Sequence, residues 1–157
     1  MKHLITITLF IVTLMLSGCG EQMPKGLPPL YPCTLTFTQN GTPLAGGMVS
    51  LVPVEASLPF SFSGLTDARG SLTPLVQGKY KGIPAGKWKI GVRKEEFRTE
   101  GNFEWTVTLV DKQYYTAADS PLEIVIAKGK NNFTFDVGAA VEEQMSEKAP
   151  KNGGSGK

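Results

Sequence analysis

Few side chains in this chain of 157 residues could do chemistry, and carboxylates are the first candidates. Glu95 and Glu96 are adjacent, and Glu100 and Glu104 follow shortly after them. Two carboxyl groups roughly 5–9.5 Å apart across a cleft would suit glycoside hydrolysis. Adjacent residues of an extended segment point to opposite sides, however, and basic residues lie nearby in the sequence. We therefore expect a solvated mixed-charge loop at this place and predict no catalytic residue.

The N-terminal segment contains the single histidine, His3, and one of the two cysteines, Cys19. A short basic start is followed by residues 4–16, which are apolar apart from threonines, and then by small residues. This is the layout of an export signal. A membrane span needs roughly 20 apolar residues, so the short run favours a processed signal over a retained helix.

The motif Leu16-Ser17-Gly18-Cys19 in this position resembles the lipobox of bacterial lipoproteins. The resemblance implies cleavage before Cys19, diacylglycerol on its sulfur, and attachment to a membrane of the cell envelope. Residues 1–18 would then be the signal peptide. A plain secretory signal is the alternative. Gly20 stands where Asp would mark inner-membrane retention in well-studied Gram-negative bacteria, which favours the outer membrane over the inner one.

Residues 19–32 are expected to form a lipidated tether. Four prolines in this stretch favour extended backbone without regular hydrogen bonding. At about 3.1 Å per residue, such a tether would lift the following domain up to ~40 Å from the membrane.

Charge and composition exclude several function classes. Without residues 1–18 the basic and acidic residues nearly balance, so there is no basic excess that would attract nucleic acid. The remaining chain has no histidine, which excludes the usual serine and cysteine hydrolase centres and the common zinc sites. We expect neither metal nor cofactor. Cys33 is interpreted as a small apolar residue at the start of a strand, with a reactive or cross-linked thiol as the alternative.

The pattern of apolar residues predicts an all-β domain over residues 33–138. Alternation is clearest in residues 33–38 and 87–93, where Trp88, Ile90 and Val92 share one face. Shorter strands are predicted at 47–53, 60–66, 71–76, 103–110, 122–127 and 132–137, the last two as a closing hairpin. Strands at this spacing predict a seven- to eight-stranded antiparallel Greek-key sandwich.

Two segments are predicted to lack strands. Residues 94–102 are polar and are expected to form a loop. Residues 139–157 are charged and then glycine-rich, and are expected to be a disordered polar tail with a weak helical turn near 141–145.

Turn residues separate the predicted strands. Asn40-Gly41 tolerates positive φ and indicates a hairpin. Asp67 and Gly70 suit the first and last positions of a type I turn, and Pro84 and Gly86 frame a third turn. A calcium loop at Asp67 is the alternative, but calcium needs six or more oxygens and no second carboxylate is near in sequence.

These motifs resemble carboxypeptidase-regulatory-like domains. Asn40 to Gly47 resembles the start of that family's pattern, the Thr66–Gly70 turn resembles its second motif, and Ile83–Ile90 its third. The end of the domain, residues 120–137, is similar to the last hairpin of small transthyretin-like lipoproteins of planctomycete type. The resemblance implies a prealbumin-like sandwich without peptidase activity.

The sequence thus predicts a non-catalytic, lipid-anchored module of the cell envelope that binds protein or glycan or acts as a structural spacer. Phe97, Phe103, Tyr114 and Tyr115 are the candidate partner-binding residues, in loops 95–103 and 114–119. Packing of these aromatics under their own loops is the alternative. A carboxylate-based hydrolase of envelope polysaccharide and an isopeptide-linked adhesin-like module are weaker alternatives, the latter because residues 33–38 contain no lysine.

Overall fold

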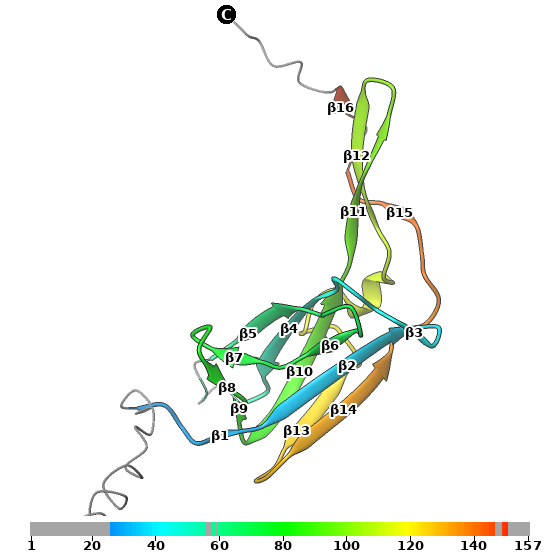
Figure 1. Cartoon of the computed structure of the whole chain (residues 1–157). Helices are drawn as coiled ribbons and strands as arrows, with labels where there is room; N and C mark the ends of the chain where they lie inside the picture. Colours follow the sequence, from blue (N-terminus) through cyan, green and yellow to red (C-terminus); the bar gives the residue numbers. More distant parts are fainter. Residues whose placement is uncertain (1–25, 56–57, 59, 147–148, 151–157) are drawn as a thin grey trace, which may run out of the picture.

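The structure, a computed structural model, describes residues 26–55, 58, 60–146 and 149–150 (Figure 1). Within these residues the chain forms sixteen strands and one short 3₁₀ helix, η1 (Lys112–Tyr114), which confirms the all-β prediction. The strand count is higher than expected because half of the strands have only two residues; the other eight have four or more. Among the described residues, no helix has the length and apolar character needed to cross a membrane.

One four-stranded antiparallel sheet has the order β13-β10-β4-β5. Its strands are β13 (Glu123–Ile126), β10 (Gly86–Arg93), β4 (Met48–Pro53) and β5 (Phe62–Leu65). The inward residues of the central strand β10 are Trp88, Ile90 and Val92, and each is fully buried. The predicted alternation over 87–93 is therefore confirmed, and this strand anchors the core.

A second sheet has the order β14-β2-β3, with β6 also paired to β2. Its strands are β14 (Asn131–Asp136), β2 (Cys33–Gln39), β3 (Thr42–Pro43) and β6 (Ser71–Leu72). The β14–β2 pair is parallel over six positions, from Asn131 opposite Cys33 to Asp136 opposite Thr38. The expectation of a purely antiparallel fold is therefore wrong.

The predicted closing hairpin is also wrong. β13 pairs with β10 and β14 pairs with β2, so the connection at 127–130 carries the chain from one sheet to the other. Both strands alternate apolar and polar residues because each turns one face to the same core. The side chain of Asn131 holds this corner: its amide accepts from the Ala127 N–H and donates to the carbonyl oxygens of Ala127, Gly129 and Pro32.

The hydrophobic core lies between the two sheets and includes residues of both. Phe37 of β2 stacks on Phe135 of β14 with ring centroids 5.6 Å apart, and Phe62 of β5 lies 5.2 Å from Trp88. Full burial of a large apolar side chain contributes about 1.5–3 kcal/mol, so the buried rings of Phe37, Phe62 and Trp88 each stabilise the body.

The body begins earlier in the chain than expected. β1 (Leu30–Tyr31) pairs with β9 (Ile83–Pro84), and Leu27, Leu30 and Tyr31 pack against the core. The second half of the expected tether, 19–32, is thus attached to the body, because its apolar side chains have a surface to cover. A small hairpin of β7 (Leu75–Val76) and β8 (Tyr80–Lys81) lies at the same end as β1 (Figure 1).

The predicted turns lie where expected. Asn40 and Gly41 have φ of 50° and 78° and join β2 to β3. Asp67 Oδ1 accepts hydrogen bonds of 2.8 Å from the N–H groups of Arg69 and Ser71, and the Gly70 N–H donates to the Asp67 carbonyl. These bonds lower the pKa of Asp67, with the Ser71 bond as the main cause.

The third predicted turn separates β9 from β10. Pro84 ends β9, and Gly86, with φ of 136°, begins β10. The indole N–H of Trp88 donates to the Pro84 carbonyl at 3.2 Å, which satisfies the one polar atom of this buried side chain.

The clearest departure from the sequence prediction is a projecting two-stranded ribbon. Residues expected to form a loop form β11 (Glu95–Glu100), which pairs with β12 (Phe103–Thr108) over six positions. The ribbon rises from the body at the end opposite β1 (Figure 1). An exposed ribbon needs no apolar face, so the polar residues of β11 lack the alternation that predicts a strand with one buried face.

Part of the expected disordered tail also forms strands. β15 (Glu143–Gln144) and β16 (Ala149–Pro150) pair with β12, where a weak helical turn and disorder were predicted. β12 offers these residues an unpaired edge, and backbone hydrogen bonding requires no particular side chains.

Candidate functional site

The ribbon presents different side chains on its two faces. Opposite residues of an antiparallel pair point to the same side, so Phe97 shares a face with its partner Thr106, and Arg98 shares the other with Trp105. Phe97 is 85% exposed, the largest value among the exposed large hydrophobic residues of the described chain. Phe103, at the tip and on the Arg98 face, is 49% exposed. The ribbon thus carries an accessible aromatic ring on each face.

Ion pairs hold the Arg98 face. The Arg98 guanidinium lies 2.5 Å from the Glu96 carboxylate and 3.3 Å from that of Glu142, the residue before β15. These contacts raise the pKa of the guanidinium, the hydrogen bond to Glu96 most of all. At the base of the ribbon, Lys112 lies 2.5 Å from Glu143. Exposed pairs contribute at most about 1 kcal/mol each, so these ion pairs add little to the stability of the ribbon.

The two tyrosines predicted as partner-binding residues lie at the base of the ribbon and not on it. Tyr114, in η1, packs against the hydrophobic core, which matches the alternative considered for it. Tyr115 is half-buried; its hydroxyl lies 3.3 Å from Glu95, and the Arg93 guanidinium lies 5.9 Å from its ring centre. Burial is the main reason why the pKa of Tyr115 is raised. Of the four predicted partner-binding residues, only Phe97 in β11 and Phe103 in β12 therefore lie on the ribbon.

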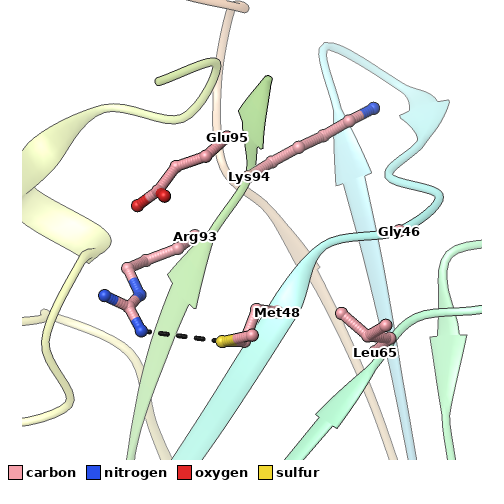
Figure 2. A pocket seen from close by; sticks show the side chains of 6 residues that line it. All are labelled: Gly46, Met48, Leu65, Arg93, Lys94 and Glu95. Atoms are coloured by element: carbon pink, nitrogen blue, oxygen red, sulfur yellow. Dashed lines mark hydrogen bonds between the residues drawn. The ribbon is translucent and has the colours of Figure 1, made fainter. Parts of the chain in front are cut away.

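A shallow hollow of about 240 Å³ lies beside this base (Figure 2). It is lined by Gly46, Met48, Leu65, Arg93, Lys94 and Glu95. The Arg93 guanidinium donates to the Met48 sulfur at 3.5 Å, and Leu65 pairs with Met48 across β4 and β5. The hollow is thus lined by the apolar side chains of Met48 and Leu65 and by charged groups of both signs.

The adjacent carboxylates of Glu95 and Glu96 do not converge on one point. Glu95 and Glu96 are neighbours in β11 and point to opposite faces of the ribbon, as expected for an extended segment. Glu96 is bound to Arg98, and Glu95 is the one carboxylate that lines the hollow. Among the described residues, no group of three or more His, Cys, Asp or Glu side chains is placed to hold a metal ion.

The structure describes only one of the two cysteines, Cys33. Cys19 lies outside the described residues. Cys33 is 2% exposed at the start of β2 and makes no disulfide. Burial raises the pKa of its thiol to about 11, so little thiolate exists near neutral pH.

Sequence reasoning missed one structural carboxylate, Asp136 at the end of β14. Its two oxygens accept from the Thr38 hydroxyl at 2.7 Å and from the N–H groups of Gly41 and Gly138 at 2.8 Å. These bonds lower its pKa to about 2, the Thr38 bond most of all. No sequence signal connects Asp136 to Gly41, because the link depends on the parallel pairing of β14 with β2.

Comparison with protein-family models, with curated proteins and with solved structures found no match to this chain.

Proposed function

We propose that this chain is a non-catalytic, lipid-anchored module of the bacterial cell envelope that binds a protein partner through its β11–β12 ribbon. In this proposal the two sheets form a Greek-key sandwich of prealbumin type, as in carboxypeptidase-regulatory-like domains, and Cys19 carries the lipid. The body holds the ribbon away from the anchored end.

The observation that carries the proposal is the exposure of Phe97 on an element that does not contribute to the core. Aromatic residues dominate binding energy at protein interfaces when a partner buries them. Phe103 lies on the other face, so a groove that receives the ribbon would contact both rings. A protein groove suits this shape better than a glycan, because the two accessible rings lie on opposite faces of the ribbon and cannot both stack on one sugar ring.

The arrangement of charged groups argues against catalysis as the role of this surface. General acid and base catalysis requires groups that converge on one reacting atom. Glu95 and Glu96 diverge, and the hollow beside them is a shallow surface feature with a single carboxylate. We therefore assign the ribbon to binding.

Photo-crosslinking in living cells tests the proposed site. We expect a benzoyl-phenylalanine residue at position 97 to give a discrete adduct with one envelope protein. Val125 on β13 is the matched position, because it is apolar, 63% exposed and on the body. The same residue at 125 should give no such adduct.

Substitution of the ring then measures its contribution. Phe97→Ser should weaken binding of the identified partner about 30-fold, the usual effect of losing an aromatic hot spot of ~2 kcal/mol. Val125→Ser should leave the affinity unchanged. Equal adducts at both positions, or equal affinity of the two variants, would contradict the assignment of the ribbon as the binding element.

A further inference from the structure

We propose that the end of the body beside β1 lies against an anionic phospholipid surface, held there by lysines on either side of the chain where it enters the body. The inference rests on the lipid anchor proposed above. It adds an orientation: one end of the domain faces the membrane and the ribbon faces away.

Two of these lysines lie in a turn of fixed shape. Lys128 and Lys130 are exposed in the connection between β13 and β14. Asn131, only 8% exposed, bonds through its side chain to Ala127 and Gly129 within this turn. It also donates through both its backbone N–H and its side-chain amide to the carbonyl of Pro32. The turn is thus bonded directly to the segment that enters the body.

The other two lysines lie on the β7–β8 hairpin. Lys81 is exposed and precedes Gly82, whose backbone approaches Tyr31 so closely that a Cβ would lie 2.5 Å from the Tyr31 carbonyl oxygen. Lys79, in the same hairpin, is also exposed. Gly82, which follows Lys81, therefore contacts Tyr31, and Asn131, which follows Lys130, is bonded to Pro32.

Charge at this end contrasts with charge on the ribbon. Glu55, which follows β4, is an acidic residue at this end, and Lys87 and Lys89 are engaged by Glu123. The ribbon and the segment beside it carry more acidic than basic side chains: Glu95, Glu96, Glu100, Glu104, Glu142 and Glu143 against Arg98 and Lys112, both of which are bound to glutamates. A negatively charged surface attracts the first end and repels the second.

The length of the connecting chain keeps the basic end near the membrane. Gly26 is the first described residue and is seven positions from Cys19. Seven extended residues span at most about 25 Å. Leu27 and Leu30 pack against the core, so the entry point does not separate from the body. A domain anchored at Cys19 therefore keeps its lysines within a few Debye lengths, each about 8 Å, of the lipid headgroups.

Hydrogen exchange of the purified, processed protein in nanodiscs tests this orientation. We expect backbone amides of 127–131 and 77–82 to be protected in nanodiscs of phosphatidylcholine with phosphatidylglycerol, relative to phosphatidylcholine alone. Ribbon amides should exchange equally in both. The double variant Lys128→Gln/Lys130→Gln should lower the ratio of docked to undocked molecules about 30-fold, since each lysine near an anionic surface contributes about a fivefold factor.

The matched control removes the same charge from the other end. Arg69 and Lys112 are exposed, and Arg69→Gln/Lys112→Gln should keep the protection. Equal exchange in the two lipids, or equal loss in both double variants, would overturn the orientation. Failure of the protein to remain with the nanodiscs would instead contradict the lipid anchor, so the two proposals fail in different ways.

Discussion

Gly70, in the turn before β6, lies in close contact with the backbone of β2. Its φ is 72°, and a Cβ there would lie 2.2 Å from the Phe37 carbonyl oxygen. The Phe37 N–H donates to the Gly70 carbonyl at 2.8 Å, so the two backbones are already in contact. Gly41 has a similar φ of 78° but open space around it.

Alanine substitutions at Gly41 and Gly70 would distinguish the cost of backbone strain from the cost of steric overlap. Gly41→Ala should cost about 1 kcal/mol for the left-handed conformation alone. Gly70→Ala should cost about 3 kcal/mol or more, because the strand carrying Phe37 must move as well. Urea unfolding of both variants measures the difference. Equal losses would mean that the contact with Phe37 relaxes freely.

Asp136 makes stability depend on pH. Its pKa is about 2 in the folded chain against 3.8 ordinarily, so its contribution is complete above pH 3.8 and is lost as pH falls through about 2. Asp67 and Glu123 also have lowered pKa values, so the wild type loses stability in this range for several reasons. Asp136→Asn should therefore show a shallower loss between pH 5 and pH 2 than the wild type. Urea midpoints across that range provide the measurement, and parallel curves would rule out the role assigned to Asp136.

At the scale of strands, the alternation of apolar and polar residues predicted correctly which residues are buried. It predicted less well which strands are neighbours. Leu35, Phe37, Trp88, Ile90 and Val92 are all buried as expected. The same pattern in β13 and β14 suggested a hairpin, but alternation reports only that one face is covered. The partner strand depends on long-range packing, here on a corner that Asn131 stabilises through its hydrogen bonds.

The candidate site was predicted only in part. Phe97 and Phe103 were identified by residue type, but as members of a loop. The charges of β11 alternate with Phe97 and Thr99, which is compatible with a strand exposed on both faces, and such a strand lacks the apolar face on which the prediction relied. The contact between Tyr115 and Glu95 joins residues 20 positions apart and could not be read from local pattern.

The ribbon should open more readily than the body. β11 pairs only with β12, and its side chains are exposed or half-buried, whereas β10 has neighbours on both sides. Local opening requires little free energy where few apolar contacts are lost. Amides of β11 should therefore exchange at least about 100-fold faster than those of Ile90 and Val92 in β10. Hydrogen exchange resolved by residue would measure this, and equal protection would show that the ribbon unfolds only with the whole domain.

At the scale of the whole molecule, the proposed lipid at Cys19 has a direct chemical readout. The mature protein should begin at Cys19 and carry the mass of its acyl chains, because cleavage breaks the peptide bond before Cys19 and lipid is attached to its sulfur. Intact mass spectrometry and labelling with radioactive palmitate would detect it. Cys19→Ala should take up no label, whereas Cys33→Ala should be labelled like the wild type. Label on the Cys19→Ala chain would contradict the assignment.

The parallel pairing of β2 and β14 determines how the domain would respond to force. The chain enters β2 at Cys33, at the end near β1, and leaves β14 at Asp136, at the end near the ribbon. A pull between an anchored N-terminus and the segment that follows β14 would act along these two strands in opposite directions. All six paired positions would then share the load in shear, and none could be opened one at a time as in an unzipped hairpin. A module held at one end and pulled at the other would resist extension through this single pair of strands.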